Sequence, residues 1–255
     1  MTPPDSDPFQ LPETPGLGNC GSCKYFASGP PWVCQMCASW TLEPAMPFFC
    51  GVCGQQLLTE TAQCSNPLCT SPHRQFEFNR AIAMKTGVLD RGVRAHKYDR
   101  VTGWGTIFAR VLLGYLDSHP DVAAADLIIP MPAAPLPSGA TSRMGIDHSG
   151  WVIESAAIQD TRHRYPFRAD PPVIIKTRAT SRMASTSNYS ERRTTAADIY
   201  RALQMLDPGA VQGKTVVVVD DVFTTGLTLD AVARRLREAG ASVVRGVTLA
   251  RQPWG

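Results

Sequence analysis

The chain has two groups of residues whose types and spacing are suited to chemistry. In the first, two adjacent carboxylates, Asp220 and Asp221, follow four consecutive valines and precede the hydroxyl-rich run Thr224–Thr228. Carboxylates can hold ribose hydroxyls or a magnesium ion, and a turn that contains glycine can wrap a phosphate with backbone N–H groups. An acidic pair alone could merely end a strand, but the pair together with this turn predicts a sugar-phosphate site.

The elements around the acidic pair should place it at the edge of a sheet. The run Val216–Val219 favours a strand buried on both faces, as in a parallel sheet. Apolar residues then recur at helical spacing, which predicts a helix that begins near Thr228 and stops at Gly240. The first N–H groups of a helix are unpaired and its dipole favours an anion there, so the turn should bind phosphate at the carboxyl end of the strand.

The second group consists of all eight cysteines, which lie in the first third of the chain as three Cys-x-x-Cys pairs and one Cys-x4-Cys pair. Each Cys-x-x-Cys pair can place two thiolates on one tetrahedral ion. We therefore expect two structural zinc sites, while crossed pairing between them, an iron–sulfur centre and a disulfide framework stay open as alternatives. The expected ligands are Cys20, Cys23, Cys34 and Cys37 at the first site and Cys50, Cys53, Cys64 and Cys69 at the second.

The cysteine-rich segment has few apolar residues and is too short to fold on a core alone. Metal binding, worth about 10–16 kcal/mol for a structural zinc site, would therefore supply its folding free energy. A zinc ion that is closed by four sulfurs has no open position for a substrate, so we expect no catalysis at the metals.

Composition bounds the organisation of the chain. A length of 255 residues fits one ordinary domain with a small module, and a net charge of +3 gives no strong case for nucleic-acid binding. No apolar run reaches membrane-spanning length, so we expect a soluble, cytoplasmic protein with no membrane partner. The expected parts are a disordered proline-rich tail over 1–18, the cysteine module over 19–75 and an α/β domain over 76–255, divided into a hood or lead-in over 76–125 and a core over 126–255.

Apolar periodicity predicts alternating strands and helices in the α/β domain. Because this alternation is typical of a mainly parallel sheet covered by helices on both faces, we expect that fold class. Residues 95–99 form a short segment without a clear prediction. The predicted strands are 126–130, 172–176, the run from Val216 and 242–250, and the predicted helices are 103–119, 149–159, 190–206 and the helix that begins near Thr228.

The stretch from Asp220 to Thr228 resembles the phosphoribosyl-diphosphate (PRPP) loop of the type I phosphoribosyltransferases. In that family the two acids contact the ribose hydroxyls, and the Thr-Thr-Gly-x-Thr turn cradles the 5′-phosphate of PRPP, which binds with magnesium. The resemblance implies that Asp220 and Asp221 are the catalytic, ribose-holding residues. It also implies a phosphate cradle made of Thr224, Thr225, Gly226, Leu227 and Thr228, in which Leu227 acts through its backbone alone.

A cysteine-rich module ahead of such a domain resembles the ComF/GntX-like family of competence-associated proteins, which join an N-terminal double zinc ribbon to a type I phosphoribosyltransferase domain. The family's Arg-Gly-Phe-Asn-Gln stretch corresponds here to Arg143–His148, in which the Arg and the Gly are kept with altered spacing and Phe-Asn-Gln is not. The resemblance is also carried by Lys97-Tyr98, Ile129–Pro132, the Arg192-Arg193 region and Val247–Arg251. The candidates for contacts with pyrophosphate, or for a lid over 177–193, are Lys97, Arg143, Arg192 and Arg193.

The two resemblances leave three hypotheses for the function. The first is an enzyme that transfers phosphoribose from PRPP to an unknown acceptor and releases pyrophosphate. The second is a non-catalytic protein that binds PRPP or a nucleotide and works through partners. The third, implied by the competence family, is an adaptor in DNA uptake or processing that works with a helicase or single-stranded DNA. A homodimer is common for the resembled fold, and no motif identifies the acceptor.

Overall fold

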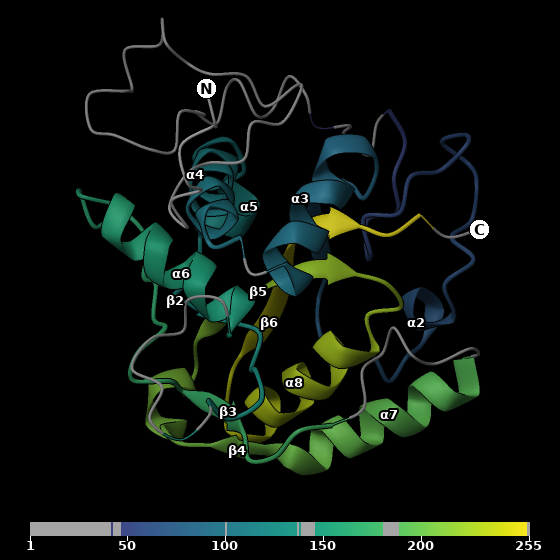
Figure 1. Cartoon of the computed structure of the whole chain (residues 1–255). Helices are drawn as coiled ribbons and strands as arrows, with labels where there is room; N and C mark the ends of the chain where they lie inside the picture. The colour runs from purple at the N-terminus through teal and green to yellow at the C-terminus, as the bar shows by residue number, and fades with distance from the viewer. Residues whose placement is uncertain are drawn as a thin grey trace, which may run out of the picture.

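In the computed structural model, residues 42, 47–99, 101–136, 138, 146–180 and 189–253 are described (Figure 1). No helix among them is long and apolar enough to cross a membrane. The strands are β1 (Asn79–Met84), β2 (Leu127–Pro130), β3 (Ile174–Lys176), β4 (Leu203–Met205), β5 (Thr215–Phe223) and β6 (Val243–Arg251). The helices are α2 (Pro67–Thr70), α3 (Gly87–Tyr98), α4 (Gly103–Ser118), α5 (Pro120–Ala123), α6 (His148–Gln159), α7 (Tyr189–Ala202) and α8 (Leu227–Glu238), with a 3-10 turn η2 (Pro208–Val211).

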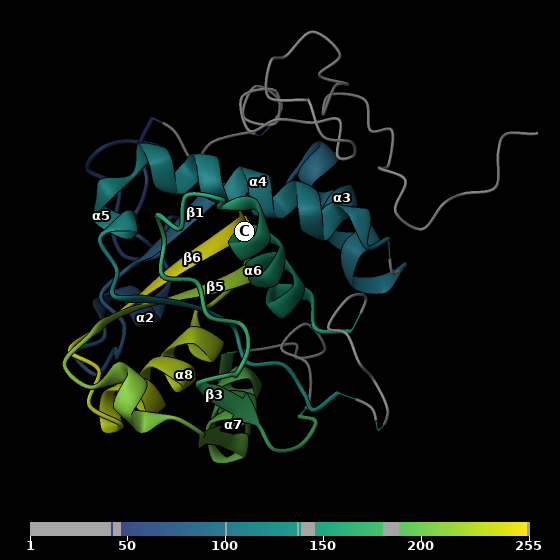
Figure 2. The same cartoon turned by 90° about the vertical axis from the view of Figure 1, so that its left-hand side faces the viewer.

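Four parallel strands form the central sheet, in the order β1-β6-β5-β2. Figure 2 labels β1, β6 and β5, and Figure 1 labels β2. The predicted Val216 strand is β5, which lies inside the sheet between β6 and β2. Register pairs such as Ile129↔Val218 and Asp220↔Thr248 bring the carboxyl ends of these three strands to one edge of the sheet. The predicted α/β fold with a mainly parallel sheet is thereby confirmed.

Each face of the sheet carries its own apolar core, because side chains alternate along a strand. Val217 and Val219 of β5 pack into a core with α3, α4 and α6. Val216 and Val218 belong to the core on the other face, where α7 and α8 cover them. Figure 2 shows the two helical layers on opposite sides of the sheet. The four valines are therefore buried on both faces, as their uninterrupted apolar run predicts.

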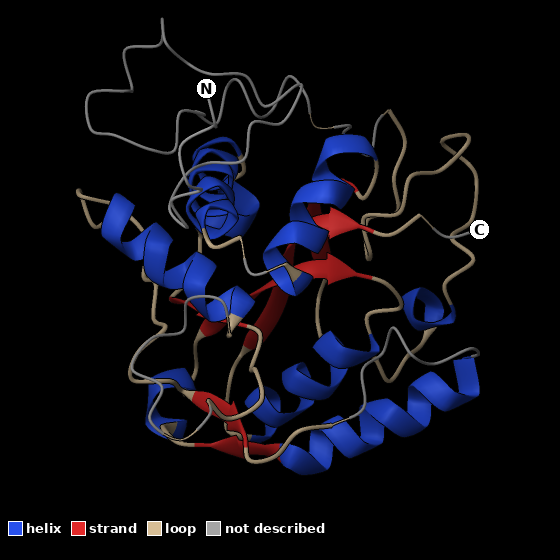
Figure 3. Ribbon diagram, viewed as in Figure 1, coloured by secondary structure: helices blue, strands red, loops and turns tan. Residues whose placement is uncertain are grey.

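Strands β3 and β4 form a separate two-stranded antiparallel sheet (Figure 3). The sequence predicted one helix over 190–206, but α7 ends at Ala202 and β4 follows at once. Leu203 of β4 and Ile174 of β3 are buried in the same core, so pairing with β3 replaces the last helical turn. Segments of three residues are too short to show a strand period, which is why the sequence did not predict β4.

The lead-in contributes more regular structure than the sequence predicted. Residues 95–98 form the last turn of α3, which packs its apolar side on the core through Leu89 and Val93. The sequence did not predict β1, which pairs in parallel with β6 at the edge of the central sheet. Asn79 at the start of β1 is fully buried, and its Nδ2 donates to Thr248 Oγ1 over 3.1 Å. A buried polar residue of this kind interrupts the apolar alternation that marks a strand.

Candidate functional site

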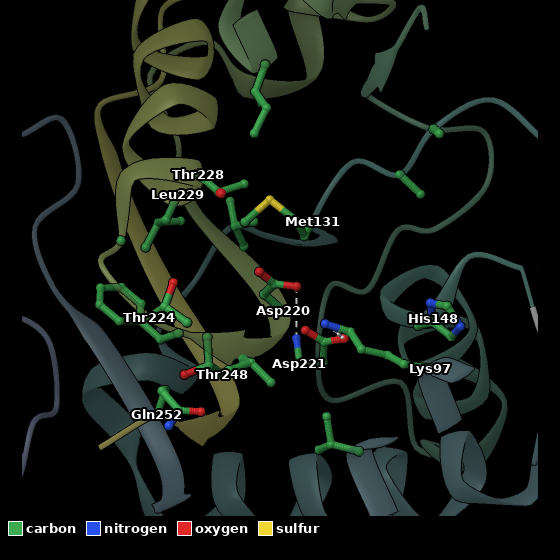
Figure 4. Close-up of a pocket in the computed structure, with 18 of the residues that line it drawn as sticks. Lys97, Met131, His148, Asp220, Asp221, Thr224, Thr228, Leu229, Thr248 and Gln252 are labelled. Atoms are coloured by element: carbon green, nitrogen blue, oxygen red, sulfur yellow. Dashed lines mark hydrogen bonds and ion pairs between the residues drawn. The ribbon is translucent and has the colours of Figure 1, made fainter. Parts of the chain in front are cut away.

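A cavity of about 810 Å³ opens at the carboxyl end of β5 (Figure 4). Its polar lining comes from elements far apart in the sequence: Lys97 from the last turn of α3, Asp220 and Asp221 from β5, Thr224 from the loop before α8 and Thr228 from the first turn of α8. Figure 4 shows Lys97 reaching toward Asp221, with Thr224 and Thr228 on the other side of the acids. The carboxyl ends of parallel strands are where open α/β sheets bind their ligands.

The turn into α8 has the backbone geometry of an anion-binding loop. Gly226 is the N-cap of α8, and its φ of +84° lies in the left-handed region that favours glycine. A Cβ at this position would lie 2.4 Å from Cζ of Phe223, so close packing also requires glycine. The first turn of α8 therefore meets the cavity with N–H groups that have no partner within the helix. Of the predicted cradle residues, Thr224, Gly226 and Thr228 line the cavity, and Thr225 and Leu227 are buried.

The two acids lie inside a strand rather than after it, because β5 continues to Phe223. Asp221 is buried, and its Oδ2 lies 2.6 Å from Nζ of Lys97. Asp220 is partly exposed, and its Oδ1 accepts from Oγ of Ser149 at 3.3 Å and from the backbone N–H of Asp221 at 2.9 Å. The acids are therefore oriented by α3 and α6, two helices on the same side of the sheet.

Charge at the site is unevenly distributed. Burial, and then the negative charge of Asp221, raise the pKa of Asp220 to about 7. Burial alone would lower the pKa of Lys97, but the carboxylates of Asp221 and Asp220 outweigh it and raise that pKa above its ordinary value. Lys97 therefore stays charged, while Asp220 exchanges its proton near neutral pH. Perturbed groups of this kind, gathered in one cavity, are typical of functional sites.

Residues 174–255, which include the acids, the turn and α8, match the family model of the phosphoribosyl transferase domain. Over these residues, about a third of its length, the chain is similar to a type I phosphoribosyltransferase domain. Its four-stranded parallel sheet, with helices on both faces, is typical of that fold.

No curated protein matches the chain. Among solved structures, one titled "structure of the allosteric regulatory enzyme of purine biosynthesis" is similar at 22% sequence identity, with a TM-score of 0.33. The similarity covers 57% of this chain and 26% of that one, so the chain spans roughly a quarter of the length of that relative.

Lys176 is a further cation at the cavity, in addition to Lys97, and the sequence did not single it out. It ends β3 and lines the cavity. Burial lowers its pKa, although the carboxylates of Asp220 and Asp147 act in the opposite direction. Neither Lys176 nor Ser149 lies near the acids in sequence. Their only local signal is a polar side chain at the end of a strand or at the start of a helix.

Among the residues considered for pyrophosphate, the structure places Lys97 at the cavity. Arg192 and Arg193 lie on α7, where Arg192 is half-buried and Arg193 is exposed, and neither is among the described residues that line the cavity. Arg143 and residues 181–188 of the expected lid lie outside the described residues.

Four cysteines gather next to the α/β domain. Their Sγ atoms all lie within 4.8 Å of one another, with 3.6 Å between Cys53 and Cys64 and 3.7 Å between Cys64 and Cys69. Sulfurs about 2.3 Å from a tetrahedral zinc ion are ~3.8 Å apart, whereas a disulfide bond is only ~2.05 Å long. The cluster of Cys50, Cys53, Cys64 and Cys69 therefore has the donors and the spacing for one zinc ion. The other expected ligands, Cys20, Cys23, Cys34 and Cys37, lie outside the described residues.

Proposed function

We propose that this protein binds PRPP together with magnesium and transfers the phosphoribosyl group to an acceptor, with release of pyrophosphate. The observation that carries the proposal is the convergence on one cavity of the turn at the start of α8 and of two carboxylates, Asp220 and Asp221. The match of residues 174–255 to a phosphoribosyl transferase family model supports it.

The turn supplies the part of the site that is complementary to the 5′-phosphate. Thr224 and Thr228 offer hydroxyl donors, and Gly226 lets a phosphate approach the backbone closely. The dipole of α8, a helix of 12 residues, places partial positive charge at the same end. A phosphate bound there would meet donors that are already in place.

The two acids would accept hydrogen bonds from the ribose hydroxyls. Asp221 is held by Lys97 and Asp220 by Ser149, so both carboxylates are oriented before the sugar arrives. Because Asp220 titrates near neutral pH, hydroxyl donors beside it would favour its ionised, accepting form.

The transfer breaks the bond between ribose C1 and a pyrophosphate oxygen and forms a bond from C1 to the acceptor. The electron pair of the broken bond leaves with pyrophosphate, and the positive charge that grows at C1 gives the transition state oxocarbenium character. Magnesium carried by PRPP would neutralise part of the charge on the leaving group. Among the cations that line the cavity, Lys85 and Arg94 are paired with Asp90. Lys97 and Lys176 are the side chains that we propose to stabilise that charge from the protein.

A pyrophosphate-release assay tests the transfer. The zinc-loaded protein is incubated with PRPP, magnesium and a panel of nucleobases and amines, beside the double variant Asp220→Ala, Asp221→Ala. We expect release that depends on one class of acceptor and that the variant lacks. Equal release by both proteins would show that the activity does not come from this cavity.

A non-catalytic sensor of PRPP or a nucleotide is the second candidate. It is favoured by the positions of Arg192 and Arg193, which leave Lys97 as the one residue of the predicted pyrophosphate set at the cavity in the described part of the chain. Binding of PRPP without pyrophosphate release from any acceptor would support it.

The resemblance to competence proteins would make such a sensor an adaptor that works with a helicase or single-stranded DNA. A salt-titrated binding assay with single-stranded DNA tests direct contact, because affinity that depends on phosphate contacts falls steeply with salt. Absence of binding at low salt would exclude direct contact with single-stranded DNA, and the adaptor would then act through a protein partner.

A further inference from the structure

Asn66 connects the cysteine cluster to the turn that faces the cavity. It lies between Cys64 and Cys69, and only 1% of its surface is exposed. Its Oδ1 accepts from the N–H of Leu68 at 3.1 Å and so caps α2, while its Nδ2 donates to the carbonyl oxygen of Thr225 at 3.0 Å. Figure 1 shows α2 beside the loop that joins β5 to α8. The oxygen of this buried amide is therefore bonded to α2, and its nitrogen is bonded to the turn before α8.

The hydrogen bond to Thr225 sets the direction of the next N–H group. In a trans peptide the C=O and the N–H point to opposite sides, so a Thr225 carbonyl held by Asn66 turns the N–H of Gly226 away from Asn66. Gly226 lines the cavity, and its N–H belongs to the turn that we assign to the phosphate. If this peptide rotated, a carbonyl oxygen would replace the donor that faces the anion. The contact with Asn66 therefore favours the orientation that binds phosphate.

Arg251 makes a second connection between the cluster and the turn. It is the last residue of β6 and is fully buried. Its Nη1 donates to the carbonyl oxygen of Phe223 at 3.1 Å, and its Nη2 lies 3.8 Å from Sγ of Cys53, within donating distance of sulfur. Phe223 and Thr225 flank Thr224 in the sequence. The carbonyl groups on both sides of Thr224 are thus held by residues that belong to the cysteine segment or touch it.

We propose that Asn66 is a positioning residue for the phosphate turn, and that the four-cysteine cluster fixes the turn through Asn66 and Arg251. Helix α2 has only four residues, too few to be stable alone. The position of its cap, Asn66, therefore depends on Cys64 and Cys69, which lie on either side of Asn66 in the sequence. A zinc ion on Cys64 and Cys69 would hold both ends of the segment that carries Asn66. The inference rests on the proposed function of the turn as a phosphate site.

The variant Asn66→Asp tests the contact with the smallest change in shape. Its side chain can still accept from the N–H of Leu68, because Asp caps helices as well as Asn does. It replaces the donor to Thr225 by a second acceptor, which removes the hydrogen bond. The matched control is Thr70→Val, an exposed residue next to Cys69 whose hydroxyl, among the described residues, donates to the carbonyl oxygen of Pro67 alone.

Three readouts are measured on the full-length protein purified with zinc. Metal analysis gives the zinc content. Calorimetric titration gives the affinity for PRPP with magnesium, and hydrogen–deuterium exchange gives the protection of residues 224–228 without ligand. We expect Asn66→Asp to keep its zinc content, to bind PRPP about tenfold or more weakly, and to exchange faster across the turn. We expect Thr70→Val to resemble the wild type in all three respects. If Asn66→Asp loses zinc, Asn66→Ser takes its place, because a serine hydroxyl caps α2 but is too short to reach Thr225.

The outcomes separate this inference from the proposed function. Wild-type protein that fails to bind PRPP would overturn the proposed function, and the exchange measurement would still decide whether Asn66 holds the turn. Wild-type exchange rates over 224–228 in the variant would overturn the positioning role, whatever the affinity. Faster exchange with unchanged PRPP affinity would also overturn it, because the turn would then be held by Asn66 without any effect on phosphate binding.

Discussion

Nζ of Lys97 lies 2.6 Å from Oδ2 of Asp221, and this ion pair joins the last turn of α3 to the carboxyl end of β5. Asp221 is only 5% exposed, so the two charges attract each other more strongly than a pair in open water would. The lead-in that precedes the core thus takes part in the site directly. Its helix α3 supplies a cation to the cavity that the acidic strand β5 lines.

Replacing Lys97 with Met should weaken PRPP binding about 10- to 100-fold, because it leaves a mostly buried carboxylate without its cation and removes a positive charge that a polyanion would meet. Lys97→Arg keeps the charge and should lose less affinity than Lys97→Met. Calorimetry on the three proteins measures the effect. The control is Lys214→Met, which changes a lysine next to the amino-terminal end of β5, away from the cavity. Wild-type affinity in Lys97→Met would show that the ion pair is not part of the binding site.

Asp220→Asn should stabilise the ligand-free protein at alkaline pH, although it removes a proposed ribose contact. The pKa of Asp220 is raised in the folded protein from 3.8 to about 7, so its ionisation disfavours the folded state. The wild type therefore loses stability from this group as the pH rises from 3.8 to about 7, and the asparagine variant does not.

The free energy of unfolding of Asp220→Asn should exceed that of the wild type by roughly 1–3 kcal/mol at pH 8 and by little at pH 4. Denaturant unfolding at both pH values measures the difference, and Asp99→Asn, a substitution of an exposed acid, serves as the control. A difference that does not change with pH would show that burial of the Asp220 charge has no energetic cost.

Alanine substitutions at two glycines with positive φ distinguish the cost of backbone strain from the cost of steric overlap. Gly226 has a φ of +84° and would place a Cβ against Phe223 and Leu68, whereas Gly213 has a φ of +70° and open space around it. Gly226→Ala should therefore lose roughly 1–3 kcal/mol more unfolding free energy than Gly213→Ala, and it should also lose PRPP binding. Thermal unfolding and calorimetry check both claims. Equal losses in the two variants would mean that the turn into α8 relaxes around the added methyl group.

Cys64→Ser should remove about one equivalent of zinc, because it breaks the cluster whose sulfurs lie at zinc-binding distances. Metal analysis of the purified protein measures the zinc content, and we expect two equivalents in the wild type because the second set of four cysteines should bind its own ion. The variant should also unfold at a lower temperature, since structural metal binding contributes folding free energy. Unchanged zinc content in Cys64→Ser would exclude this cluster as a zinc site.

The local part of the site could be predicted from the sequence. The run from Val216 to Thr228 specifies a buried strand, a turn and a helix through neighbouring residues, and the structure confirms each of these elements. The structure differs from the prediction at one point, because Asp220 and Asp221 lie within β5 instead of following it.

Contacts between distant segments could not be predicted in this way. The pairing of Lys97 with Asp221 depends on how α3 packs, and the pairing of Asn66 with Thr225 depends on how α2 packs. Residue spacing along the chain does not indicate how these helices pack. The same limit applies to β3 and β4, whose antiparallel pairing involves three residues on each side. Local composition also suggested Arg192 and Arg193 as phosphate contacts, yet both lie on α7 and outside the cavity lining.

Calorimetric titration of the zinc-loaded protein with PRPP and magnesium, beside the double variant Asp220→Ala, Asp221→Ala, tests the central claim most directly. The site described above predicts binding in the micromolar range by the wild type and its loss in the variant, with the variant still folded and zinc-loaded. Absence of binding by the folded, zinc-loaded wild type, or equal binding by the variant, would contradict the assignment of this cavity to PRPP.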